Sequence, residues 1–273
     1  MNKIILTLFL LLGATAPALA DVITVDGTII DGQTFTSTLS VKAHDVIIRN
    51  CTIDMAWDGS DGWYGISNVY YDSNGNPRST NLLIENCTVR GGTTGIYVHH
   101  ARVMFNDITD VGADAMKCST RGNSRFIGNH TARLGLIPGS HADGLQLVGG
   151  SNVLIAYNHF DIPISHADSG PWGSNAGCMI HNGNADISRI FIFRNLFDGG
   201  NYSIFLTHKN GSPWQAPTLC RVNYNTFTHD YRFGPFSWDY DPLIQVNGNR
   251  WDDGSLMDYG QWDINTWDDW PNQ

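Results

Sequence analysis

A short pattern recurs along this chain and constrains its fold more strongly than any other feature. In each copy, apolar residues lie five and three positions before an Asn or a Cys, and a mostly apolar residue follows two positions after it. Alternating apolar residues indicate a short strand with one buried face, and an Asn at a fixed position indicates a tight turn. The repeated positions are Cys51, Cys87, Asn106, Asn129, Asn158, Asn195, Asn225 and Asn249.

The spacing between copies indicates a solenoid. Successive copies are 19 to 37 residues apart, and a minimum near 20 residues matches one coil of a parallel β-solenoid, with inserted loops in the longer coils. A propeller blade needs about 40 residues, and leucine-rich repeats need a leucine pattern that is absent, so both are excluded. We therefore expect an all-β, single-stranded parallel β-helix with inserted loops, in which the side chains at the repeated positions form an Asn/Cys ladder.

The Asn/Cys ladder over residues 22–251 resembles that of the right-handed parallel β-helix proteins, the pectate-lyase-like superfamily. The resemblance implies right-handed coils and a superfamily made up largely of polysaccharide lyases, uronate epimerases, glycoside hydrolases and phage tailspikes. A fold does not fix a function. The D-P-H-D pattern of alginate epimerases, the R-x-P-x-x-R pattern of pectate lyases and most of the polygalacturonase pattern are absent. No catalytic residue is therefore carried over from a named family.

The two ends of the chain differ from the repeats. Residues 1–20 have Lys3, an apolar run and an A-x-A site ending at Ala20, which is typical of a secretory signal peptide. We expect a secreted protein, extracellular or periplasmic, with no membrane segment in its mature form. The domains are then a signal peptide (1–20), a β-helix domain (21–250) and an acidic, Trp-rich C-terminal cap (251–273), which terminal repeats require.

Composition narrows the choice of partners. The chain has 26 acidic and 16 basic residues and a net charge of −10, which argues against nucleic acid as a partner. Five cysteines are too few to hold a chain of 273 residues by disulfides, so the fold depends on a hydrophobic core. Cys51 and Cys87 share a ladder position on adjacent coils, either as a disulfide or as stacked small side chains. We expect a monomer that acts on a polysaccharide.

A second strand recurs before each ladder strand, and its outward positions collect polar side chains. Coils are about 4.8 Å apart, so outward side chains in register lie close enough to act together. The third residue of each copy forms one outward column, which contains Tyr97, Lys117, Gln146, Met179 and Phe205. The fifth residue forms a second, which contains His99, Ser119, Val148, His181 and Thr207. Asp114 and Asp143 lie at the head of two adjacent coils.

The candidate catalytic residues come from this face. They are Lys117, His141, Asp143 and Asp114. A purely structural alternative is that Asp143 caps a turn and Gly144 permits its bend. We favour the functional interpretation because several polar residues converge with Lys117 on one face. The candidate substrate-binding residues are Gln146, Tyr97, His99, Arg121 and His181.

These residue types suit several reactions. A lyase needs a base, here Lys117 or His141, and a positive group that neutralises the uronate carboxylate. That group is Arg121 or a calcium ion held by Asp114 and Asp143; the sequence requires no other cofactor. A C5 epimerase would share the first step, and a glycoside hydrolase would use the two carboxyl groups instead. A non-catalytic carbohydrate-binding or surface protein is the remaining alternative. We expect an extracellular lyase that cleaves a uronate-containing polysaccharide by β-elimination.

Two further features bear on binding. The long coils carry aromatic residues, which either contact sugar rings or pack the loops onto the helix. These residues are Trp57, Trp63, Tyr64, Tyr70, Tyr71, Trp172 and Trp214. No His or Cys spacing along the chain is typical of a zinc site.

Overall fold

The structure, a computed structural model, describes residues 21–58, 60, 62–162, 174–208, 211–238 and 245–258. Within these ranges the chain forms strands, turns and loops without a helix, and accordingly no helix that could cross a membrane. The expected signal peptide (1–20), most of the expected cap (259–273) and Trp172 lie outside the described residues.

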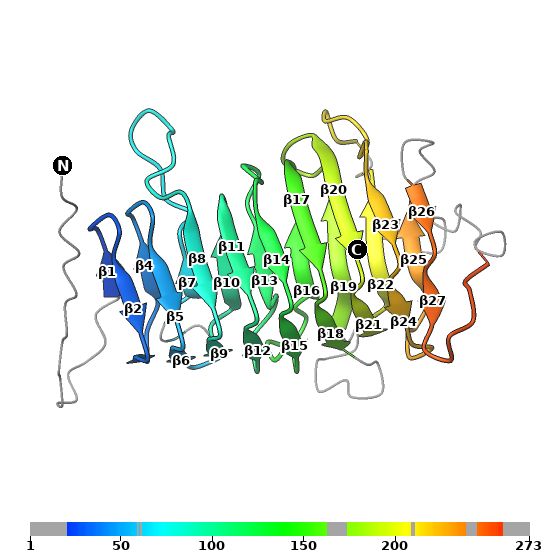
Figure 1. The fold of residues 1–273 in the computed structure, drawn as a ribbon, viewed down its shortest axis with the longest axis horizontal. Coiled ribbons are helices and arrows are strands. Elements are labelled where there is room, and N and C mark those ends of the chain that lie inside the picture. Colours follow the sequence, from blue (N-terminus) through cyan, green and yellow to red (C-terminus); the bar gives the residue numbers. More distant parts are fainter. Residues whose placement is uncertain are drawn as a thin grey trace.

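Strands of the described residues form three parallel sheets of nine strands each, here named A, B and C (Figure 1). Sheet A consists of β1 (Asp21–Ile23), β4 (Leu39–Val41), β7 (Tyr64–Ser67), β10 (Thr94–Val98), β13 (Met116–Cys118), β16 (Ala142–Leu147), β19 (Ser174–His181), β22 (Tyr202–Thr207) and β25 (Gly234–Trp238). Sheet B consists of β2 (Ile29–Asp31), β5 (Ile47–Arg49), β8 (Leu82–Glu85), β11 (Ala101–Met104), β14 (Arg125–Ile127), β17 (Gly150–Ala156), β20 (Ile187–Phe193), β23 (Arg221–Asn223) and β26 (Gln245–Asn247). Sheet C consists of β3 (Thr34–Phe35), β6 (Thr52–Asp54), β9 (Thr88–Arg90), β12 (Asp107–Thr109), β15 (His130–Ala132), β18 (His159–Ile162), β21 (Leu196–Gly199), β24 (Thr226–Phe227) and β27 (Arg250–Trp251).

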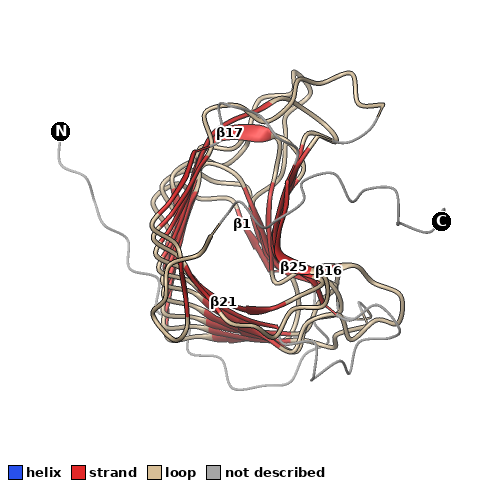
Figure 2. Cartoon of the chain, turned by 90° about the vertical axis from the view of Figure 1, so that its right-hand side faces the viewer, coloured by secondary structure: helices blue, strands red, loops and turns tan. Residues whose placement is uncertain are grey.

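Each coil passes through sheets A, B and C in turn, and the next coil pairs with it in parallel. Viewed from the C-terminal side of the stack, the chain turns anticlockwise as it advances toward the viewer, so the helix is right-handed (Figure 2). The expected fold, a single-stranded right-handed parallel β-helix, is confirmed. The repeat pattern did not include the first coil, β1 to β3, because its ladder position holds Gln33 in place of an Asn or a Cys. Ile30 pairs with Ile48, which lies three residues before Cys51, so Gln33 corresponds to Cys51.

The asparagine ladder runs along the turn between sheets B and C. Asn158 is typical: its Oδ1 accepts hydrogen bonds from the backbone N and the Nδ2 of Asn129, both at 2.9 Å. Its own Nδ2 donates to the Phe126 carbonyl and to Asn195 Oδ1, again at 2.9 Å. The residue before it, Tyr157, has a φ of 57°, the left-handed conformation that makes this turn tight. Such bonds run from Asn106 to Asn249, so each coil is held in register with the next.

The two cysteines of the ladder are stacked and are not joined by a disulfide. Cys51 and Cys87 are both free and buried. Their thiols lie 3.1 and 3.3 Å from the carbonyls of Arg49 and Glu85 in the same turns, and the backbone N of Cys87 donates to Asn106 Oδ1 at 2.9 Å. The cysteines thus occupy ladder positions without continuing the amide-to-amide bonds.

The core is the interior of the coil. In its C-terminal half, Phe160, Phe197 and Phe227 stack with centroids 5.0 and 5.1 Å apart and nearly parallel planes. Aliphatic side chains, among them Ile48, Ile84 and Val103, fill the remaining interior. Because inward residues are used for this packing, chemistry is left to the outer faces of the sheets.

Candidate active site on the outer face of sheet A

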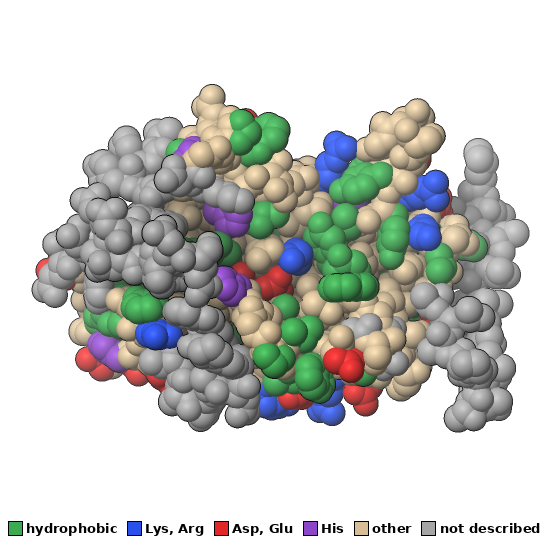
Figure 3. Space-filling view, turned by 180° about the vertical axis from the view of Figure 1, so that it is seen from behind, with side chains coloured by type: hydrophobic (Ala, Val, Ile, Leu, Met, Phe, Trp, Pro, Cys, Tyr) green, Lys and Arg blue, Asp and Glu red, His purple; other side chains and the backbone are tan. Residues whose placement is uncertain are grey.

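Five coils bring their third-residue side chains into one column, as the repeat predicted. Tyr97 pairs with Lys117, Lys117 with Gln146, Gln146 with Met179, and Met179 with Phe205. The residues on either side of Lys117, Met116 and Cys118, are fully buried and face the interior. Figure 3, which shows this side of the molecule, has basic, acidic and histidine side chains close together, next to hydrophobic ones. We call this surface the sheet A face.

Lys117 is held on the sheet A face by a buried carboxylate. Its Nζ lies 2.9 Å from Asp114 Oδ2, and the exposed fractions of the two side chains are 27% and 4%. The other oxygen of Asp114 accepts a hydrogen bond from the backbone N of Asp143 at 3.0 Å. Asp114 therefore fixes a cation at the surface and also joins two neighbouring coils.

Asp143 lies deeper than the sequence suggested. It is fully buried, and its carboxylate oxygens accept bonds from Asn175 Nδ2 at 2.9 Å and Gln146 Nε2 at 3.2 Å. A β-bulge between Ala142 and Asp143 shifts the pairing with β19 at this point. The structural alternative, a turn cap, requires backbone amides that donate to Asp143, whereas these two donors are side-chain amides.

Gly144, next to Asp143, was expected to permit a bend, but space is the actual constraint. A Cβ at this position would lie 2.4 Å from the Phe160 ring and 2.7 Å from the Gly177 carbonyl. Glycine is needed here because the strand passes directly over the phenylalanine stack. The local sequence Asp-Gly therefore reflects core packing beneath the site.

Burial dominates the electrostatics of the two carboxyl groups. It raises the pKa of Asp143 well above the ordinary value, and the nearby Asp114 charge raises it further. Burial also raises the pKa of Asp114, although the charge of Lys117 opposes this. We interpret the pair as holding one proton: Asp143 as the acid, because it is the more buried, and Asp114 as the carboxylate that faces Lys117.

His141 and Tyr97 are the other reactive groups of this face. His141 is exposed and lies directly before β16, the strand that carries Asp143. Burial, followed by the nearby Tyr64, raises the pKa of Tyr97 to about 12. Tyr97 thus stays protonated at neutral pH and is suited to donating a hydrogen bond. The rings of Tyr64 and Tyr97 are 5.1 Å apart and form one aromatic surface.

Asp114 and Asp143 do not fit a calcium site in this arrangement. Calcium takes about six to eight oxygen ligands, whereas here an ammonium nitrogen lies 2.9 Å from one carboxylate. The other carboxylate accepts bonds from two side-chain amides inside the protein. The donors around this pair are those of a hydrogen-bonded ion pair.

Three of the expected substrate-binding residues lie away from the centre of the sheet A face. His99 is fully buried: its Nε2 lies 3.1 Å from the Ser79 carbonyl, under the loop of residues 68–80. The expectation that it faces the substrate is wrong for this structure, because an inserted loop covers it. Arg121 donates to the Gly75 carbonyl at 2.7 Å and so braces the same loop.

His181 is the third of these residues. It is half-buried at the end of β19, where it pairs with Thr207 of β22. His181 lies two residues after Met179 on the same strand, and this strand belongs to a later coil than Lys117.

Asn175 is a residue that the sequence did not single out. It lies on β19, is 6% exposed, and donates the shorter of the two side-chain bonds to Asp143. The pairing of Ala142 with Ser174 and of Asp143 with Ala176 makes Asn175 the extra residue at the irregularity. The available sequence signal was an alignment of the two strands by their glycines. In that alignment Asn175, two residues before Gly177, corresponds to Ala142, two residues before Gly144.

The aromatic residues of the long coils remain partly exposed. Trp63 is 70% exposed, Trp57 43%, Trp214 40% and Tyr71 37%. Tyr71 is stacked under Arg121, with 5.5 Å between the guanidinium and the ring, and Tyr70 bonds Ser40 through its hydroxyl at 2.8 Å. Tyr70 and Tyr71 thus pack their loop against the helix, whereas Trp57 and Trp63 present much of their surface to solvent.

Comparison with known proteins found similar solved structures but no matching family. No protein-family model matches the sequence, and no curated protein matches it. A solved structure described as a glycoside hydrolase aligns over 80% of this chain and 38% of its own length, with 12% identity and a TM-score of 0.48. The surface protein and adhesin PfbA of Streptococcus pneumoniae aligns over 85% of this chain and 66% of its own length, with 12% identity and a TM-score of 0.43.

A third similar structure is the A-module of the mannuronan C-5 epimerase AlgE4 of Azotobacter vinelandii, with 12% identity, a TM-score of 0.40, and coverage of 86% of this chain and 79% of that module. The present chain spans less than two thirds of the length of the first two structures. At such identities and TM-scores, the activity has to be argued from the site itself.

Proposed function

We propose that this protein is a polysaccharide lyase that cleaves a uronate-containing glycan by β-elimination on the sheet A face. The observation that supports the proposal is the Lys117 ammonium, fixed at the surface by the buried Asp114 at 2.9 Å. Such a cation is preorganised for the carboxylate of a uronate, because the carboxylate behind it prevents the lysine side chain from moving away.

The ion pair assigns Lys117 an electrostatic role. A lysine that is paired with a carboxylate is protonated and is a poor base, so Lys117 would bind the substrate carboxylate and stabilise the enolate-like charge that develops on it. His141, which is exposed directly before β16, is then the base. Tyr97 and Gln146 flank Lys117 in the same column and would hydrogen-bond the sugar.

The reaction balances with these groups. The neutral His141 ring takes the proton α to the uronate carboxyl group, and the electron pair moves into that carboxyl group, where Lys117 faces it. The electrons then form the C4–C5 double bond as the C4–O bond breaks. The leaving oxygen takes a proton from the histidinium ring or from water. Protein and solvent supply every proton, and no oxidant or reductant is needed.

A glycoside hydrolase is less well supported by the same geometry. It needs two carboxyl groups that both reach the scissile bond. Here the Asp114 side chain is 4% exposed and Asp143 is fully buried. The proton that the pair holds thus lies on Asp143 inside the protein, away from any leaving group.

The test is a polysaccharide panel with and without Ca²⁺, followed by the ultraviolet absorbance of unsaturated uronates and by reducing ends. We expect both signals on a uronate polymer, and a loss of about 10²- to 10⁴-fold in kcat/KM for His141→Gln. Lys117→Met should lower kcat/KM by about 10²-fold or more. Lys42→Met is the matched control, because Lys42 lies 4.7 Å above the Tyr70 ring on the first coils.

Other outcomes would replace the proposal. New reducing ends without absorbance would assign hydrolysis to the Asp114 and Asp143 pair. A glycan that is retained but never cleaved, with unchanged affinity in His141→Gln, would identify a binding protein. Activity that survives both Lys117→Met and His141→Gln would move the site elsewhere on the helix.

A further inference from the structure

We propose that His159, Asp161 and Asp198 form a binding site for a divalent transition-metal ion, with Zn²⁺ as its probe, on the outer face of sheet C. One ligand atom from each of the three side chains lies within 4.8 Å of the others. The site is on a different sheet from Lys117, and the inference does not depend on the proposed lyase activity.

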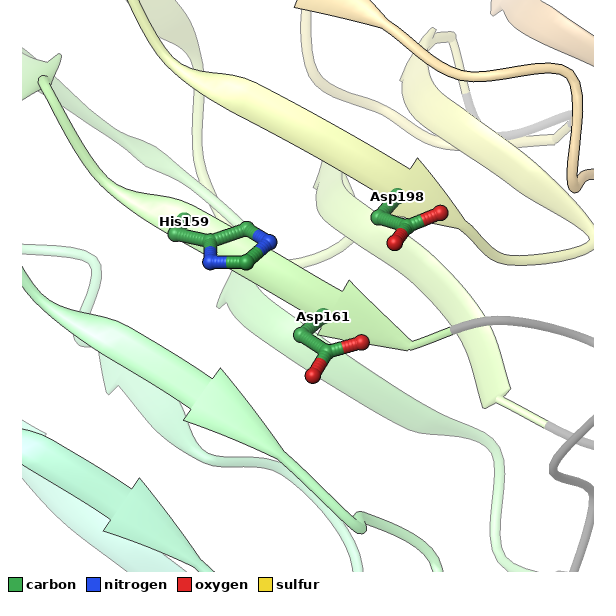
Figure 4. Close-up of side chains that lie close together, drawn as sticks. All are labelled: His159, Asp161 and Asp198. Atoms are coloured by element: carbon green, nitrogen blue, oxygen red, sulfur yellow. The ribbon is translucent and has the colours of Figure 1, made fainter.

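The fold brings the three residues together from two coils. His159 and Asp161 are two positions apart on β18, so both side chains point outward from the same face of the strand. Asp198 of β21 is paired directly with Asp161. Figure 4 shows the imidazole and the two carboxylates on the same side of these adjacent strands.

Two carboxylates at directly paired positions repel each other, which destabilises a sheet unless a positive charge lies between them. A divalent cation would remove this repulsion and gain one nitrogen and two oxygen ligands. All three ligand residues are half-buried, which leaves a side open for water as a further ligand. This set suits Zn²⁺, since imidazole is a ligand of zinc and related metals, whereas calcium takes oxygen ligands alone.

Two polar groups lie around the three ligands. Thr228 Oγ1 donates a 2.7 Å hydrogen bond to Asp198 Oδ1 and so orients that carboxylate. On the coil before β18, His130 Nδ1 lies 2.7 Å from Asp107 Oδ1, and its Nε2 lies 3.8 Å from Asp161 Oδ2. Thr228 thus orients one proposed ligand, as outer-shell groups of metal centres do, whereas His130 is a neighbouring group and not a ligand.

The sequence pattern did not suggest zinc because the ligands come from separate coils. Asp161 and Asp198 each lie three positions after a ladder asparagine, and His130 and His159 each lie one position after. Alignment by the ladder places them in two outward columns, although no spacing within the linear sequence is typical of zinc. A metal ion there would join β18 to β21 from outside, where the phenylalanine stack joins them from inside.

The experiment is a calorimetric titration of the full chain with Zn²⁺ after removal of metals by a chelator. We expect one high-affinity ion per chain and a melting temperature that rises with Zn²⁺. His159→Ala and the nearly isosteric Asp198→Asn should each weaken Zn²⁺ binding by more than about 100-fold, and Thr228→Ala by about 10-fold. His229→Ala is the matched control, because His229 also lies beside an aspartate, Asp252, at 3.6 Å, outside this cluster.

Several results would overturn the site. One is a wild-type chain that binds no Zn²⁺ in the titration. Another is an affinity that stays unchanged in both His159→Ala and Asp198→Asn, which would place any bound zinc elsewhere. Preference for Ca²⁺ over Zn²⁺, unaffected by His159→Ala, would remove the histidine from the ligand set. Asp198→Asn provides the answer if His159→Ala does not fold. Glycan cleavage is a separate assay, so its failure is distinguishable from failure here.

Discussion

Lys117 and Asp114 form an ion pair of 2.9 Å in which the ammonium group is at the surface and the carboxylate is buried. Asp114 also accepts the backbone N–H of Asp143 from the next coil. One carboxylate thus positions a cation and stabilises the stacking of two coils. A surface ion pair alone contributes little to stability, so the arrangement is better explained by the position that it gives to Lys117.

Asp143→Asn should change how stability depends on pH. Burial raises the pKa of Asp143 above its ordinary value of 3.8. Above pH 3.8 the unfolded chain therefore loses this proton while the folded protein retains it, and stability falls as pH rises toward the folded pKa. We expect the melting temperature of Asp143→Asn, relative to wild type, to increase as the pH rises above 3.8. A constant difference over this range would contradict the protonated state of Asp143.

Asp110→Asn is a control of opposite sign for that measurement. The hydrogen bond from Arg133 lowers the pKa of Asp110, so its contribution to stability is present above pH 3.8 and is lost as pH falls further. Asn tolerates the left-handed conformation at this position, where φ is 57°. The variant should be less stable than wild type at neutral pH and approach it in acid.

His99→Gln should make the protein less sensitive to acid. Burial lowers the pKa of His99 from 6.5 to about 4. On acidification the unfolded chain takes up this proton first, so stability is full above pH 6.5 and falls as pH drops toward 4. Melting curves across this interval should therefore show a smaller decrease for the variant than for wild type. Equal decreases would mean that His99 is not buried as a neutral ring.

Asn158→Ala should destabilise the helix strongly. It removes the buried side-chain bonds to the backbone N–H of Asn129 and to the Phe126 carbonyl. At about 1–3 kcal/mol for each buried group, the free energy of unfolding should fall by about 2–6 kcal/mol in urea titrations. Asn247→Ala, at an exposed position of β26, should change it by less than about 0.5 kcal/mol. Similar losses for both variants would show that the ladder bonds contribute little.

All five thiols should be reduced and protected from reagents. Each cysteine is buried and outside any disulfide, and burial raises the pKa of Cys118 to about 12. A thiol reagent should label no cysteine in the folded protein and all five after denaturation without reductant. Labelling of two fewer in the denatured chain would indicate a disulfide between Cys51 and Cys87.

Much of the fold follows from local sequence. The alternation of apolar residues before each ladder position specifies the strands, and the ladder asparagine specifies the turn, because both depend on residues a few positions apart. The same spacing placed Tyr97, Lys117 and Gln146 in one outward column, which the register confirms. It also indicated that Asp114 and Asp143 lie on adjacent coils, which the bond between them confirms.

The tertiary structure decided what these outward positions face. His99 was expected at the surface, but the inserted loop of residues 68–80 covers it, and loop paths do not follow from the coil period. Asn175, at an irregularity in the pairing of β16 with β19, donates to Asp143, whose carboxyl group is buried inside the protein. His159, Asp161 and Asp198 became neighbours only through the pairing of β18 with β21. Sequence determined the coil because its bonds are local and repeated, whereas burial and proximity at the sites depend on which distant segments lie against it.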